Sequence, residues 1–233
     1  MEVLGWDFKR DVSTDYILRP GLAMPVFGAS KWHLKVMRDA FFGATKIGGM
    51  PANVLNSVSS IAILIDGECS DFCYEDEQAH CNHDGRICIL RRDAKELKRI
   101  VWHEAGHAWY YELQRRYLRG NRDGARSRLL DNDWFTEWND AAKGLFKLLD
   151  DYKNEWSGDF PKSGILRSFG LKNIREDIAT WVEEVNAACN GCENLFGRVQ
   201  KDDIRYQKKL KILLDKGFIT GNQYNFIKPL CTP

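Results

Sequence analysis

Residues 103–107 read HEAGH, which places two imidazole side chains four residues apart. On an α-helix, residues i and i+4 lie on one face, one turn apart. His103 and His107 can therefore direct two nitrogen atoms at one metal ion, at the distance of about 2.0–2.1 Å that zinc–imidazole bonds require. The motif predicts a zinc-binding helix, and it constrains the fold more than any other stretch of the chain.

Glu104 has a separate role in this pattern. Its carboxylate follows the first histidine and can reach a water molecule held by the metal without itself being a ligand. Zinc lowers the pKa of such a water toward about 7, and a neighbouring carboxylate can take the proton. The spacing is thus typical of hydrolytic zinc sites. The alternative is two ordinary histidines on one helix, but a capping signal and a strand signal just upstream favour the zinc site.

Hydrophobic periodicity predicts an α+β fold around the motif. Apolar, β-branched runs predict strands at 61–65 and 86–90. Helical spacing of apolar residues predicts helices at about 30–44, 51–57, 93–117, 134–155, 173–188 and 202–215. This order indicates a small antiparallel or mixed sheet packed on a mainly helical domain. Residues 1–29 contain several turn-forming residues and are expected to be an irregular N-terminal arm, with residues 30–233 as a single domain.

The third metal ligand must come from outside the motif, because a catalytic zinc usually keeps three protein ligands and one open position. No third histidine follows at the short spacing of the metzincins. The best downstream candidate is the stretch 168–180, SFGLKNIREDIAT, in which Asn173 can cap a helix and Glu176 lies in its first turn. Asp177 and Glu183 are rival ligands. Glu176 could also be a solvated carboxylate that the helix dipole favours.

The combination of HExGH with a later S-[YF]-G-x5-E-x-x-A resembles the gluzincin metallopeptidases. Among them it is most similar to the catalytic domain of anthrax lethal factor and its relatives. The resemblance covers the strand before the metal helix, the helix itself and residues 168–180, and it implies a zincin-like fold with peptidase activity. It also implies that Glu176 is the third zinc ligand, beside His103 and His107, and that Glu104 is the catalytic base.

Two positions depart from the family pattern. A family tyrosine seven residues before the third ligand lies over the metal and can stabilise the oxyanion, whereas this chain has Phe169. A family carboxylate four residues after the ligand orients a zinc histidine, whereas this chain has Thr180, a weaker partner. Another residue must then serve as the oxyanion donor, and the candidates are Arg175, Tyr152 and Tyr206.

The expected reaction is hydrolysis of a peptide bond by zinc-activated water, with Glu104 taking and later returning the proton. A protein or peptide substrate is expected to add as an extended strand along 86–90, interpreted as an edge strand. A different class of function stays open. The protein could be a structural or assembly component, or a degenerate peptidase that only binds, with a metal site that braces the fold. Phe169 and Thr180 favour that alternative.

The charge and composition of the chain limit the kinds of partner that it is expected to bind. The net charge is +1, the pI is about 7.6 and charged residues make up 29% of the chain, so nothing demands a nucleic acid or an anionic membrane. No run of 18 apolar residues predicts a transmembrane helix. The first residues lack the apolar segment of a signal peptide. We therefore expect a cytoplasmic protein, or one exported by a route that needs no signal peptide; the sequence does not predict its oligomeric state.

Seven cysteines allow three interpretations. Four cysteines lie in the middle of the chain, at Cys69, Cys73, Cys81 and Cys88. Cys189 and Cys192 form a separate C-x-x-C motif. Disulfides would need an oxidising compartment. A second, structural zinc could combine the C-x-x-C with two thiolates of the middle group. Free thiols are the third possibility, and Cys88, inside an apolar strand, is expected to be a core residue.

Overall fold

The computed structural model describes residues 2–3, 6–7, 13–19, 22–64, 79–90, 94–120, 138, 160–161 and 164–233. Within these ranges, six α-helices and a mixed five-stranded sheet confirm the α+β class. The helices are α1 (Lys31–Phe42), α2 (Ala52–Ser57), α3 (Ala94–Gly120), α6 (Ile174–Cys189), α7 (Ile204–Asp215) and α8 (Gly221–Ile227). Short 3₁₀ helices follow at η2 (Ser168–Leu171), η3 (Phe196–Arg198) and η4 (Lys228–Leu230). The helix predicted at 134–155 lies outside the described residues, except for Trp138, which is helical.

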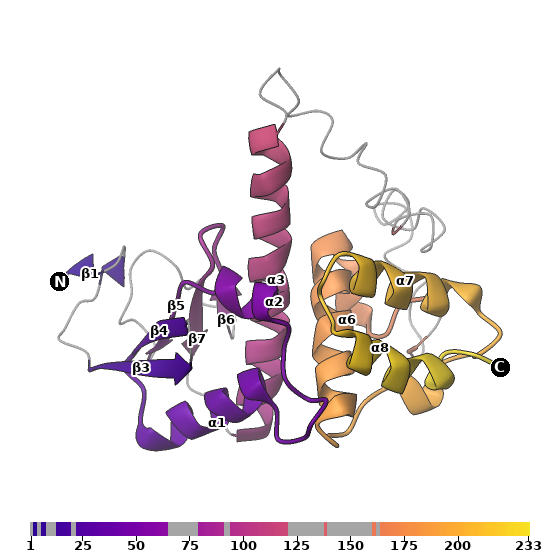
Figure 1. Ribbon diagram of the computed structural model, residues 1–233, viewed down its shortest axis with the longest axis horizontal. Coiled ribbons are helices and arrows are strands. Elements are labelled where there is room, and N and C mark those ends of the chain that lie inside the picture. The colour runs from indigo at the N-terminus through magenta and orange to yellow at the C-terminus, as the bar shows by residue number, and fades with distance from the viewer. Residues whose placement is uncertain are drawn as a thin grey trace.

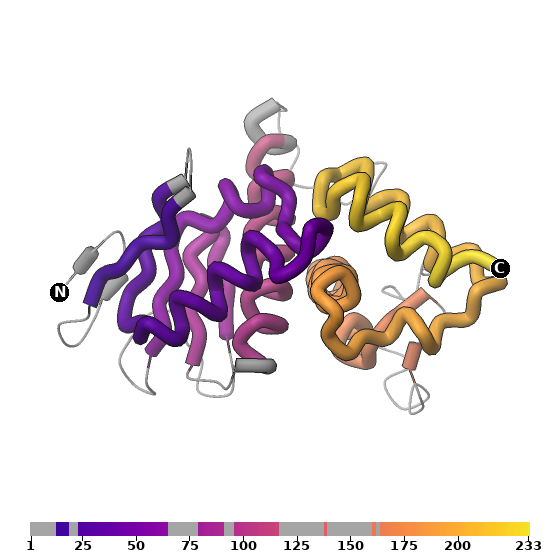
Figure 2. The backbone as a smooth tube through the Cα atoms, turned by 60° about the horizontal axis from the view of Figure 1, so that its bottom comes forward, coloured from indigo at the N-terminus to yellow at the C-terminus, as the bar shows by residue number. Residues whose placement is uncertain are grey.

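The main sheet combines parallel and antiparallel neighbours. Its strands are β3 (Thr14–Arg19), β4 (Leu22–Phe27), β5 (Ser60–Leu64), β6 (Ala79–Cys81) and β7 (Arg86–Leu90), in the order β3-β4-β5-β7-β6. The β4–β5 and β5–β7 pairs are parallel, and the two outer pairs are antiparallel. A separate two-stranded sheet joins β1 (Glu2–Val3) and β2 (Trp6–Asp7). Helix α3 stands between the main sheet and the C-terminal helices α6, α7 and α8 (Figure 1), and α1 runs across the strands (Figure 2).

The expectation of an irregular arm over residues 1–29 is wrong for the part that forms β3 and β4. These strands pair antiparallel from Thr14↔Phe27 to Arg19↔Leu22, and Ile17, Met24 and Val26 are buried in the core. Pro25 does not prevent the pairing, because the ladder of β4 with β5 begins only after it, at Val26. The turn residues of this segment therefore punctuate a hairpin of the sheet.

The expectation that 86–90 is the edge strand is also wrong. Strand β7 pairs with β5 on one side and with β6 on the other. Among the described strands, β6 is the edge beside β7. It was missed because three residues, Ala-His-Cys, are too short to show an alternating pattern.

The helix limits follow the capping residues that the sequence offers. Ser30 accepts a hydrogen bond from the backbone N–H of His33 at the start of α1. Asn173 accepts from the N–H groups of Arg175 and Glu176 at the start of α6. Gly217, with φ of 73°, follows the C-cap of α7 in the left-handed region that favours glycine. Residue 93, where the sequence predicts the third helix to begin, lies outside the described residues. No helix among them is long and apolar enough to cross a lipid bilayer.

Helices α3 and α6 approach closely at Gly106. A Cβ atom added there would lie 3.2 Å from the Cα of Ala179 and 3.3 Å from the Cβ of Val182. Ala105 beside it is fully buried. The small pair in the middle of HEAGH therefore lets the backbone of α6 pack against the turn that carries the two histidines.

Substituting Gly106→Val should push α6 away from α3. The added methyl groups would occupy space that Ala179 and Val182 fill, and such overpacking costs about 1–3 kcal/mol of unfolding free energy. Denaturant unfolding monitored by circular dichroism measures this loss. Gly197→Val is the matched control, since nothing lies within 4 Å of a Cβ at Gly197. Equal stability of the two variants would contradict the close packing.

Candidate metal centre

Three side chains from two helices meet at one point. The Nε2 atom of His103 lies 3.1 Å from Oε2 of Glu176, and the Nε2 atom of His107 lies 3.3 Å from the same oxygen. All three ligand atoms lie within 4.8 Å of one another. Ligands at about 2.0–2.1 Å from a tetrahedral ion are about 3.3 Å apart, so the arrangement fits a single cation. Among the described residues this is the one such group of histidine, cysteine and carboxylate side chains.

The local structure of α6 brings Glu176 to this point. Asn173 caps the helix and fixes its first turn, with Glu176 at the third helical position. The close contact at Gly106 then sets that turn against His103 and His107. The sequence prediction of Glu176 as the partner of the two histidines therefore agrees with the geometry.

Asp177, the first rival ligand, faces the other way. It is fully buried, accepts a hydrogen bond from Trp138 Nε1 at 2.8 Å, and forms an ion pair with the buried Lys209 of α7. Consecutive residues of a helix point in directions about 100° apart. Glu176 and Asp177 thus divide two tasks, since one faces the metal centre and the other ties α6 to α7.

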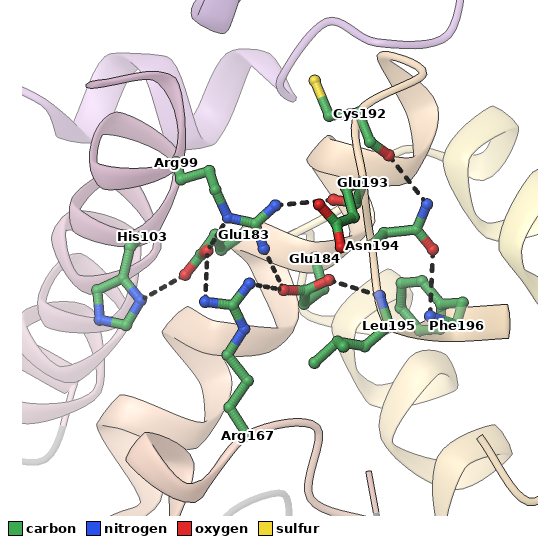
Figure 3. A network of polar contacts seen from close by, with 10 residues as sticks. All are labelled: Arg99, His103, Arg167, Glu183, Glu184, Cys192, Glu193, Asn194, Leu195 and Phe196. Carbon is green, nitrogen blue, oxygen red and sulfur yellow. Dashed lines mark hydrogen bonds and ion pairs between the residues drawn. The ribbon is translucent and has the colours of Figure 1, made fainter. Parts of the chain in front are cut away.

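Glu183, the second rival, supports a ligand and is not part of the cluster. Its Oε2 atom lies 3.4 Å from Nδ1 of His103 (Figure 3), whereas the other ring nitrogen, Nε2, lies beside Glu176. Arg99 donates to the other oxygen of Glu183 at 2.7 Å. Carboxylates in this position fix the orientation of a ligand imidazole and raise its basicity. The sequence assigned this place to Thr180. Thr180 is buried in the cavity wall, and the carboxylate comes from the next turn of α6.

A wider polar network holds Glu183 in place. Arg99 and Arg167 both form ion pairs with Glu183 and with the fully buried Glu184 (Figure 3). Glu184 also accepts from the backbone N–H of Leu195 at 2.9 Å. Burial raises the pKa of Glu184 to about 7 against the lowering effect of Arg99, and the charge of Glu183 adds to the rise. Two arginines thus form ion pairs with two carboxylates, of which Glu183 lies next to His103.

The carboxylates of the cluster favour a positively charged partner, as the pKa values of His103 and Glu176 indicate. Burial tends to lower the pKa of His103, but Glu176 and Glu183 beside it raise the pKa to about 10. Burial opposes ionisation of Glu176, yet the two histidines hold its pKa well below the usual range. A proton on His103 therefore neutralises the carboxylates in the metal-free state. A divalent cation would displace that proton, because metal binding requires deprotonated ligands.

The cluster opens into a cavity of about 650 Å³. Glu104 lines it from α3, and His80 and Cys81 line it from the edge strand β6. Glu104 is buried, and this burial raises the pKa of its carboxyl group against the opposing effect of His107 and His103. The cavity is therefore bordered by the metal-ligand cluster, by Glu104 and by β6, which is the outermost strand on its side of the sheet among the described strands.

The candidate oxyanion donors differ in their surroundings. Phe169 also lines the cavity, with its ring centroid 5.6 Å from that of His103, but it carries no hydroxyl group. Arg175 lines the cavity and donates to the hydroxyl of Tyr111 at 3.2 Å. Tyr206 is fully buried against Trp181 and is not among the residues that line the cavity. Tyr152 lies outside the described residues.

The cysteines give a mixed result. Cys81, Cys189, Cys192 and Cys231 are free thiols. Cys88 is buried, as expected of a core residue, but it is also disulfide-bonded. Cys69 and Cys73 lie outside the described residues. Burial raises the pKa of Cys189 to about 12, which keeps it a thiol. The described part of the chain therefore holds no second metal cluster at the C-x-x-C.

Comparison with known proteins finds no family model, no curated protein and no solved structure that matches this chain.

Replacing Glu183 with glutamine should weaken metal binding without removing a ligand. An amide cannot hold the imidazole of His103 as a charged acceptor, and such changes typically cost about 10–100-fold in metal affinity. Competition with a chromophoric chelator measures the affinity. Glu193→Gln is the control, because Arg99 bonds to the backbone carbonyl of Glu193. Unchanged affinity in Glu183→Gln would show that this carboxylate does not support the site.

Proposed function

We propose that this protein is a zinc-dependent metallopeptidase with a zincin-like fold. The observation that carries the proposal is the convergence of His103, His107 and Glu176, with ligand atoms within 4.8 Å of one another, beside the buried Glu104 in a cavity that the strand β6 borders. The resemblance of HEAGH and of the stretch 168–180 to gluzincins agrees with this arrangement. Together they favour hydrolysis of an extended peptide.

The ligand set suits zinc. Two imidazole nitrogens and one carboxylate oxygen form a typical catalytic zinc site, which leaves the fourth position for water or substrate. The cluster contains no fourth protein ligand among the described residues. A zinc ion held here would supply Lewis-acid chemistry, lowering the pKa of water toward about 7 and polarising a carbonyl group.

Glu104 would carry the proton. Its raised pKa makes the carboxylate a stronger base than an exposed glutamate, and so better matched to proton transfer near neutral pH. It would accept a proton from the attacking water and deliver it to the nitrogen of the leaving amine. The same residue can do both because it lies beside the cluster, on the helix that holds the two histidines.

The substrate would bind along β6. This strand uses one side to pair with β7, and His80 and Cys81 line the cavity. No other described strand pairs with β6, so an extended peptide would add to its outer side, which is a common mode of peptide recognition. The strand at 86–90 expected for this role is covered by β6, so the proposed substrate site moves outward by one strand.

A non-catalytic role is the second candidate. Phe169 is the observation that favours it, because a phenyl ring stands beside His103 where the resemblance implies a phenol. In that case the metal would brace α3 against α6, and the protein would act as a structural, assembly or binding component. Peptide turnover separates the two candidates.

Substituting Glu104→Gln should abolish cleavage while leaving zinc bound. The amide cannot accept the proton, and loss of a general base typically lowers the rate by about 10²–10⁴-fold. Cleavage of a peptide library followed by mass spectrometry measures the rate, and elemental analysis measures the zinc. Glu112→Gln is the control, because Glu112 pairs with Arg115 and Arg116 further along α3. Full activity of Glu104→Gln would overturn the proposed mechanism.

A further inference from the structure

The proposed peptidase reaction needs a hydrogen-bond donor that the family position does not provide. As water adds to the peptide carbonyl, negative charge develops on the carbonyl oxygen, and a preorganised donor there typically contributes about 10²–10³-fold to the rate. Phe169 has no hydroxyl group to donate. If the site hydrolyses peptides, a donor must come from another residue that lines the cavity.

Tyr111 lines the cavity and carries a hydroxyl group that can donate a hydrogen bond. It follows His107 by four residues and so shares the face of α3 that carries the cluster. Its ring stacks against His107, with centroids 6.3 Å apart and planes inclined by 27°, and it contacts the ring of His83 at 4.2 Å. The side chain lines the cavity, yet only 7% of the residue is exposed. Packing on both sides therefore fixes the direction of the phenol.

Arg175 controls the hydroxyl group of Tyr111. It donates to the phenol oxygen at 3.2 Å and directly precedes Glu176 in the sequence. Because the guanidinium takes up a lone pair of that oxygen, the hydroxyl hydrogen is left to donate elsewhere. A phenol keeps its proton at neutral pH, because its ordinary pKa is about 10. The result is a neutral donor at the cavity wall. It contacts the metal ligand His107 and is held by Arg175, the neighbour of the metal ligand Glu176.

We propose that Tyr111 is a catalytic residue that donates a hydrogen bond to the carbonyl oxygen of the scissile peptide, and that Arg175 positions it. This inference rests on the proposed function. In the reaction, a bond forms between the water oxygen and the carbonyl carbon, and the carbon–nitrogen bond breaks. The proton from water passes through Glu104 to the leaving amine. Tyr111 keeps its own proton throughout and stabilises the transient negative charge.

The neighbouring Tyr110 provides an internal contrast. Its hydroxyl accepts a hydrogen bond from Gln114 at 3.0 Å, and the residue is not among those that line the cavity. Both tyrosines are buried on the same helix. Substitution of either by phenylalanine removes a single oxygen atom, so the pair separates a catalytic effect from a general effect of losing a buried hydroxyl.

The test compares Tyr111→Phe with Tyr110→Phe in the zinc-loaded protein. We expect Tyr111→Phe to lower kcat by about 10²–10³-fold with little change in KM, while Tyr110→Phe stays near wild type. A peptide phosphonamidate, whose tetrahedral anion resembles the transition state, should bind Tyr111→Phe more weakly by a similar factor in calorimetry. Zinc content and thermal unfolding should match the wild type. Wild-type kcat and phosphonamidate affinity in Tyr111→Phe would overturn the assignment.

The positioning role of Arg175 has its own readout. Arg175→Gln should lower kcat. The double variant with Tyr111→Phe should be no slower than Tyr111→Phe alone, because Arg175 acts only through the hydroxyl group that Tyr111→Phe already removes. Additive losses would show that Arg175 acts independently of Tyr111. A wild type that cleaves no library peptide would overturn the proposed function and with it the catalytic role of Tyr111, whereas a cleaving wild type with an equally active Tyr111→Phe would overturn the assignment of Tyr111 alone.

Discussion

The close approach of α6 to α3 at Gly106 is the contact on which the metal centre depends. A glycine in the middle of HEAGH lets Ala179 and Val182 pack against the helix backbone. This contact brings the first turn of α6 within reach of both histidines and sets a later turn, with Glu183, behind His103. A wider separation of the helices would remove the third ligand and the supporting carboxylate together.

Charge compensation on both sides of the cluster follows from this packing. Arg99 and Arg167 neutralise Glu183 and Glu184 behind His103, whereas Lys209 neutralises Asp177 on the far face of α6. The Lys209–Asp177 pair is fully buried, and breaking such a pair by removing one partner typically costs about 3–5 kcal/mol, so this pair fixes the position of α7 against α6. Glu176 has the two histidines as its partners, and it is thereby kept ready for a cation.

Short-range chemistry made much of the site predictable. Helix spacing paired His103 with His107, and the Asn173 cap placed Glu176 in a first turn. The spacing of four residues after His107 also places Tyr111 on the metal-binding face of α3, whereas the family pattern points to other positions and leaves Tyr152 and Tyr206 as candidates. Long-range pairing was harder to predict. Strand β6 is too short for a pattern, the β3–β4 hairpin contains Pro25, and the contact of Glu183 with His103 depends on the helix crossing.

The central claim is that His103, His107 and Glu176 hold one zinc ion with an open position toward the cavity. A crystal structure of the zinc-loaded protein, with anomalous diffraction measured at the zinc absorption edge, tests it most directly. The account predicts one strong peak bonded to the two Nε2 atoms and to Glu176, with no fourth protein ligand. A peak at another place, the lack of any peak, or a shell closed by a fourth side chain would contradict it.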